Sequence, residues 1–185
     1  MEQDMTFNAY LSVLSAVIIG LAIVKLLQGI LWMIHGRQQI KVYWVHLAWV
    51  VLTIIAGINH YWRIGLIPVD VRVAEGFTRH TDILLAPLFV YFLAGLLFPR
   101  SGDDGPVDLK DFYYENRAWF FGTMVVLILP QTAWELIRLH FGLEALPLYL
   151  LPLVFGALAV SRNQRFHMAM AILGLLAGFA MLLTL

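Results

Sequence analysis

The chain has 185 residues, of which 61% are hydrophobic and 13% are charged, and its 12 basic and 12 acidic side chains cancel. A soluble domain is only about 45–50% apolar, and the excess here would leave large apolar patches in water. The composition therefore predicts an integral membrane protein. The balanced charge argues against nucleic acid binding, which needs a basic excess on one face. The absence of cysteine excludes disulfides, thiolate metal sites and covalently attached c-type haem.

Six apolar segments are candidates for membrane helices, since a helix needs about 20 apolar residues to cross a hydrocarbon core of about 30 Å. The predicted spans are 7–34, 42–62, 83–98, 118–139, 146–160 and 166–185. Spans 83–98 and 146–160 are short, so a count of six depends on their tilting or extending into neighbouring polar sequence. The chain is therefore predicted to be one all-α domain over residues 1–185, a polytopic transmembrane helical bundle.

Two segments outside the spans are also informative. The first five residues include Glu2 and Asp4 and no basic residue, so the N-terminus is acidic. A cleavable signal peptide is therefore not expected, and the first apolar segment should stay as a membrane helix. Residues 107–117 mix apolar side chains such as Leu109 and Phe112 with charges, and this pattern predicts a short interfacial helix at the membrane surface.

The basic residues predict the orientation, because cytoplasmic connections carry an excess of Lys and Arg. Eight lie near the end of the first span or in the connections after the first, third and fifth spans: Lys25, Arg37, Lys41, Arg100, Lys110, Arg117, Arg162 and Arg165. Four lie on the other side: Arg63, Arg72, Arg79 and Arg138. Both termini are therefore predicted to be periplasmic.

Polar residues inside the predicted spans are candidates for a functional site, namely Lys25, Gln28, Gln131, Glu135 and Arg138. An intramembrane charge is a functional hypothesis by default. Lys25, however, lies within about three turns of the cytoplasmic end of its span, so snorkelling to the interface or a structural contact to Gln28 is the favoured interpretation. A transport or proton-relay role is the alternative. Glu135 and Arg138 are three residues apart on one helix face, which suits an ion pair or a ligand site at the outer mouth.

The histidines raise the possibility of haem, which membrane proteins often bind through histidine pairs. His46 and His60 share one predicted span and are separated by about 21 Å along the helix and about 40° around it. This stagger suits two stacked b-type haems, whose other ligands would come from the remaining histidines: His35, His80, His140 and His167. No second helix carries the same pair, and haem is not favoured. A metal site built from His60, His80, His140 and Asp82 is an alternative that lacks HxxH spacing.

A GxxxG pattern occurs in the last predicted span, at Gly174 and Gly178. Small residues at this spacing let membrane helices approach closely. The pattern predicts a helix contact within the bundle, with a dimer seam as the alternative.

Four stretches carry a resemblance to other membrane proteins: Gly20-Leu-Ala-Ile-Val-Lys-Leu-Leu-Gln-Gly29, Tyr43-Trp-Val-His46-Leu-Ala-Trp49, Leu97-Phe-Pro99 and Phe112-Tyr-Tyr-Glu-Asn-Arg117. Over roughly its first two thirds, the chain resembles a widespread group of small bacterial membrane proteins with no assigned activity. The resemblance implies a bacterial inner-membrane location. It implies no function and no catalytic residue.

The sequence leaves four classes of function open. The favoured hypothesis is a non-catalytic accessory or assembly subunit of a larger membrane complex, whose partners are the lipid bilayer and other subunits or a second copy. A small transporter or channel acting as an oligomer is the first alternative, with a path near Pro130, Gln131 and Lys25. A b-type haem electron carrier is the second alternative. A membrane enzyme is the last class, and no recognisable catalytic motif supports it.

Overall fold

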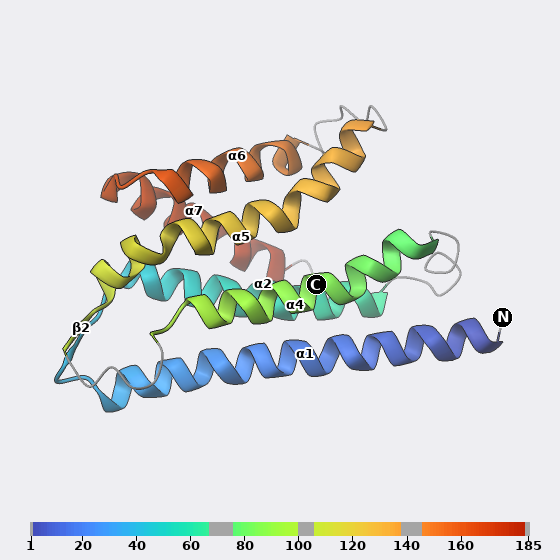
Figure 1. The fold of residues 1–185 in the computed structure, drawn as a ribbon, viewed down its shortest axis with the longest axis horizontal. Coiled ribbons are helices and arrows are strands. Elements are labelled where there is room, and N and C mark those ends of the chain that lie inside the picture. Colours follow the sequence, from blue (N-terminus) through green and yellow to red (C-terminus); the bar gives the residue numbers. More distant parts are fainter. Residues whose placement is uncertain (1, 67–75, 100–105, 138–145, 184–185) are drawn as a thin grey trace.

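The computed structural model describes residues 2–66, 76–99, 106–137 and 146–183, without the side chains of 2–9, 63–66, 76–83, 131, 134 and 135. The described part is an all-α bundle (Figure 1), as predicted. Its helices are α1 (Glu2–His35), α2 (Trp44–Leu66), α4 (Gly76–Leu96), α5 (Leu109–Ile137), α6 (Leu146–Val160) and α7 (Gln164–Leu182). Two short strands, β1 (Ile40–Lys41) and β2 (Val107–Asp108), pair in parallel.

Three described helices are long and apolar enough to cross a membrane. They contain the segments Tyr10–His35, Trp44–Trp62 and Gln164–Leu182. Two shorter apolar helical segments, Leu84–Leu96 and Leu146–Val160, accompany them. Many large apolar side chains stay exposed on the bundle surface, as lipid contact requires. The prediction of membrane helices is therefore confirmed for part of the chain.

Successive helices run back and forth, so their connections gather at two ends of the bundle (Figure 1). One end holds β1, β2 and the connection 161–163 between α6 and α7, and we call it the strand end. There the backbone N–H of Val107 donates to the carbonyl of Gln39 at 2.9 Å, and Lys41 pairs with Asp108 at 3.8 Å. The strand pair thus ties the connection after α1 to the start of α5.

The helices pack in pairs around a core made largely by α2. α1 packs mainly against α4, α5 against α6, and α7 against α2. Trp49 of α2 lies at the centre, with its ring centroid 4.9 Å from that of Phe121 on α5. Both side chains are buried, and inside a membrane rings of this kind stabilise the core through close van der Waals packing rather than by leaving water.

Two predicted boundaries differ from the structure. α4 begins at Gly76, seven residues before the predicted start of its span, because a helix continues beyond its apolar stretch while its backbone hydrogen bonds are made. Pro87 therefore lies in the interior of α4. Residues 109–117 are the first turns of α5 and not a separate helix, since no proline or glycine interrupts α5 before Gly122.

The GxxxG pattern forms a contact within the bundle. A β-carbon placed on Gly174 would lie 2.9 Å from Leu52 of α2, and one on Gly178 would lie 3.1 Å from the same side chain. The missing side chains therefore let α7 approach α2 closely. This contact agrees with the first of the two predicted uses of the pattern.

Candidate functional site

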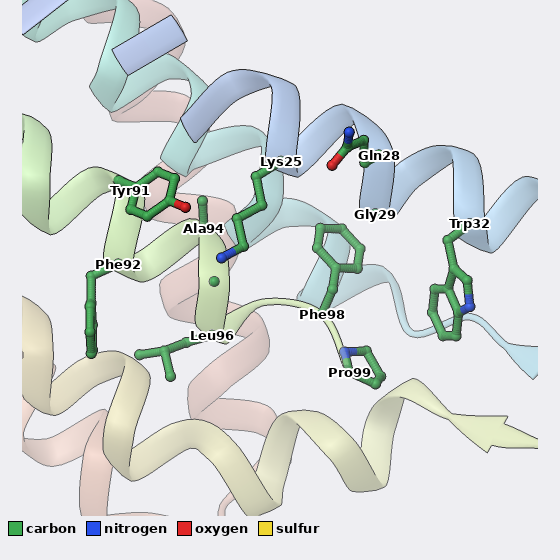
Figure 2. Close-up of a pocket in the computed structure, with 11 residues that line it drawn as sticks. Lys25, Gln28, Gly29, Trp32, Tyr91, Phe92, Ala94, Leu96, Phe98 and Pro99 are labelled. Carbon is green, nitrogen blue, oxygen red and sulfur yellow. The ribbon is translucent and has the colours of Figure 1, made fainter. Parts of the chain in front are cut away.

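A pocket of about 470 Å³ lies between α1 and α4, near the strand end (Figure 2). From α1 it is lined by Lys25, Gln28, Gly29 and Trp32, and from α4 and the residues that follow it by Tyr91, Phe92, Ala94, Gly95, Leu96, Phe98 and Pro99. The α1 residues recur at intervals of three and four, which places them on one face of the helix. The sequence therefore builds one wall of the pocket from consecutive turns of a single helix.

Lys25 is the charged group of this pocket. Its side chain extends from α1 toward α4 (Figure 2), and Nζ lies 4.9 Å from the ring centroid of Tyr91. This distance is within the range of a cation–π interaction. Lys25 is therefore held against α4 rather than extended along α1 toward the interface.

Gly95 allows the ammonium group to reach the backbone of α4. A β-carbon on Gly95 would lie 2.9 Å from Lys25 Nζ, so a larger residue there would displace the charge. α4 ends at Leu96, and the last carbonyls of a helix lack partners within the helix and carry its negative dipole end. The ammonium is thus placed where this dipole favours a cation.

The ammonium group has three N–H donors and few partners. Within the described part of the chain, the structure shows no carboxylate paired with Lys25 and no hydrogen bond to its Nζ. The Lys25 side chain is exposed on the outside of the bundle. Such a group can bind an anion that approaches sideways, from the plane of the membrane.

A second polar cluster lies at the strand end, around His167 at the start of α7. Tyr113 Oη and His167 Nδ1 are 2.6 Å apart, and His167 Nε2 is 3.0 Å from the carbonyl oxygen of Ser161. Arg117 Nε donates to the same carbonyl at 3.0 Å. This network links the starts of α5 and α7 to the end of α6.

The carbonyl of Ser161 determines the tautomer of His167. A carbonyl oxygen can only accept, so His167 Nε2 carries the proton and donates it. In the neutral form of the ring only one of the two nitrogens carries a proton. His167 Nδ1 therefore accepts, and the Tyr113 hydroxyl donates to it. Both ring nitrogens of this buried histidine are satisfied within the bundle.

His46, on α2, is buried in apolar and aromatic surroundings. The rings of Phe98, Phe112 and Tyr113 meet it edge-on, with centroid distances of 5.7–6.3 Å. The Leu97 carbonyl approaches the ring, but neither ring nitrogen reaches hydrogen-bond geometry with any described residue. A cavity of about 10 Å³ adjoins the ring, room for about one water molecule.

The residues around His46 do not fit a haem. Tyr113 fills the space between His46 and His167, with ring centroids 6.3 Å and 5.4 Å from the two histidines. Both nitrogens of His167 are already bonded. His60 lies fourteen residues further along α2, as the sequence required. The His80 side chain and all of His140 lie outside the described residues, so the outer haem and the metal alternative stay predictions.

Of the polar candidates predicted from the sequence, two line the pocket and three have side chains outside the described residues. Lys25 and Gln28 line the same pocket. Gln131 and Glu135 lie on α5, but their side chains are outside the described residues, as is all of Arg138. The sequence missed the residues of α4 that complete the pocket, although Tyr91 and Gly95 are four apart and so share a helix face. It also missed the bond between Tyr113 and His167, for which no sequence signal exists.

Two buried tyrosines at the strand end give the fold a dependence on alkaline pH. Burial raises the pKa of Tyr43 and of Tyr113 above the usual 10.0. The folded state then holds these protons more tightly than the unfolded state, and the stability gained is lost as pH rises above about 10. We expect the free energy of unfolding to fall above that pH. In Tyr113→Phe the free energy of unfolding should fall less steeply with pH. Thermal unfolding between pH 8 and 11.5 would measure it, with Tyr10→Phe as an exposed control; equal slopes in both variants would contradict the prediction.

Comparison with known proteins adds no identification: no protein-family model matches the chain, and no curated protein or solved structure is detectably similar to it.

Proposed function

We propose that this chain is a multi-pass protein of the bacterial inner membrane that acts by binding, as an accessory subunit of a larger membrane assembly. The pocket around Lys25 is where it takes an anionic group presented from the plane of the bilayer. The observation that carries the proposal is the placement of the ammonium group. It lies at the end of α4, exposed to the side of the bundle, with no carboxylate beside it among the described residues.

The free-energy cost of placing a charged side chain in the membrane supports a binding role for Lys25. A cation within a membrane helix is unfavourable unless other groups compensate it. The Tyr91 ring and the dipole of α4 compensate part of this cost. An external anion would supply the remainder, and its binding free energy would be large because water is scarce at this depth.

The orientation belongs to the same proposal. The strand end carries six described basic residues besides Lys25: Arg37, Lys41, Lys110, Arg117, Arg162 and Arg165. A basic excess marks the cytoplasmic side. We place the strand end in the cytoplasm and both termini in the periplasm, with all six helices crossing the membrane.

The test compares Lys25→Gln with Lys110→Gln, which removes the same charge from an exposed position at the start of α5. The full chain is purified from its own membranes in mild detergent and weighed by native mass spectrometry. We expect the wild-type chain to carry a bound companion, a protein or a lipid, of fixed mass and stoichiometry. We expect Lys25→Gln to lose this companion. Lys110→Gln should keep it. A bare wild-type chain, or a companion that both variants retain equally, would contradict the proposal.

A further inference from the structure

We infer that the anionic group in the Lys25 pocket is the phosphate of a phospholipid, and that the pocket is selective for lipids with a net negative headgroup. This inference rests on the proposed function, since it names the group that the same pocket binds. A carboxylate on a helix of a partner protein is the competing occupant. The shape of the pocket, the apolar surface beside it and its depth favour the lipid.

The pocket is larger than a single carboxylate needs. Its volume of about 470 Å³ falls within the range of small-molecule sites, about 300–1,000 Å³. It extends from Lys25 along α1 to Trp32, seven residues or about 10 Å further along the helix. Gln28 lines it one turn on and offers an amide that can donate as well as accept. A phosphate with its esterified headgroup matches this length and these donors.

An apolar stripe leads away from the pocket along α4. Phe92 lines the pocket, and Leu88 and Leu85 follow it at intervals of four and three toward the other end of the bundle. Their side chains are 61%, 47% and 43% exposed. The cation thus lies at one end of the stripe and the exposed apolar surface continues from it. This is the pattern of an anionic lipid, with its phosphate at Lys25 and an acyl chain against α4.

The depth of the pocket agrees with a lipid headgroup. Pro99, three residues after the end of α4, and Trp32, near the end of α1, both line it. Tryptophan favours the membrane interface because its ring is apolar and its N–H is polar. The pocket therefore reaches from the hydrocarbon region to the interface. If the strand end is cytoplasmic, the pocket lies near the cytoplasmic surface of the bilayer, where anionic headgroups of that leaflet can reach it.

The experiment places the full chain in nanodiscs of equal parts dioleoyl phosphatidylglycerol and dioleoyl phosphatidylcholine. The two lipids share their acyl chains and phosphate, and only the first has a net negative charge. After ejection into the mass spectrometer, the lipids that remain bound are counted. We expect wild type to retain phosphatidylglycerol in preference, and Lys25→Gln to lose this preference by about fivefold or more. Lys25→Arg should keep the preference, and so should Lys110→Gln.

A second variant keeps the inference testable if Lys25→Gln folds poorly. Gly95→Val leaves Lys25 in the chain but places side-chain atoms where its ammonium lies. We expect Gly95→Val to reduce phosphatidylglycerol retention as Lys25→Gln does. Equal retention of the two lipids by wild type, or unchanged retention in both pocket variants, would overturn the inference.

The outcomes separate this inference from the proposed function. If Lys25→Gln releases a protein companion while lipid retention is unchanged, the occupant is a partner's carboxylate, and the lipid inference fails although the proposed function stands. If neither lipid nor protein binding depends on Lys25, both fail. Selective loss of phosphatidylglycerol in the pocket variants supports the lipid inference whether or not a protein companion is found.

Discussion

Replacing His167 with leucine should lower the free energy of unfolding by about 2–3 kcal/mol, whereas the same replacement at His46 should leave it unchanged or raise it. Both histidines are buried, at 0% and 1% exposure. They differ in their hydrogen bonds. His167 accepts from Tyr113 and donates to the Ser161 carbonyl, while His46 makes no hydrogen bond among the described residues. Leucine at 167 leaves the buried Tyr113 hydroxyl without its acceptor.

A double variant tests the physical reason. If the orphaned hydroxyl is responsible, Tyr113→Phe combined with His167→Leu should recover part of the lost stability, because removing both partners of a hydrogen bond costs less than removing one. Thermal unfolding in detergent, followed by tryptophan fluorescence, would measure all of these variants. Equal destabilisation by His46→Leu and His167→Leu would contradict the prediction, as would a double variant less stable than His167→Leu alone.

Gly29→Ala should also be strongly destabilising, by about 1–3 kcal/mol. Gly29 is on the face of α1 that meets the end of α4, and a β-carbon there would overlap the ring of Phe98. The clash includes the ring carbon next to the Phe98 side-chain stem, so rotation of the ring cannot relieve it. Phe98 also meets His46 edge-on at 5.7 Å, so its displacement would disturb the strand end as well.

Gly20→Ala is the matched control on the same helix. A β-carbon at Gly20 meets nothing within 4 Å, and alanine favours a helix more than glycine does. Its effect should therefore be close to zero or slightly stabilising. Thermal unfolding of the two variants in the same detergent would compare them. A Gly29→Ala variant as stable as Gly20→Ala would show that α1 does not approach Phe98 this closely.

The sequence was most informative about the helices themselves. Span 146–160 was predicted with the bounds that α6 has, because polar residues such as Glu144 and Ser161 flank one apolar run. The start of α4 was missed because apolar length measures the part of a helix that lies in lipid and not the helix itself. The interfacial helix at 107–117 was wrongly separated from α5, since a change from amphipathic to apolar sequence does not by itself break a helix.

Only the part of the site that lies on α1 could be predicted from the sequence. Lys25 and Gln28 could be identified because a charge and an amide stand out within an apolar segment. Their neighbours on α4 could not, because periodicity places residues on a helix face but does not say which helix that face meets. The contact of Lys25 with Tyr91 and Gly95 joins residues about 70 positions apart. The pairing of Tyr113 with His167 was hidden for the same reason.

The Lys25 pocket can face the cytoplasmic leaflet only if α1 crosses the membrane and the strand end lies in the cytoplasm. Substituted-cysteine labelling tests this most directly, because the chain has no cysteine of its own. Single cysteines would replace Gln3 near the start of α1, and Gln38 and Arg162 at the strand end. A membrane-impermeant maleimide should label Gln3→Cys in intact cells, and should label Gln38→Cys and Arg162→Cys only after the inner membrane is opened. Labelling of Gln38→Cys or Arg162→Cys in intact cells would contradict the proposed orientation, and with it the assignment of the pocket to the cytoplasmic leaflet.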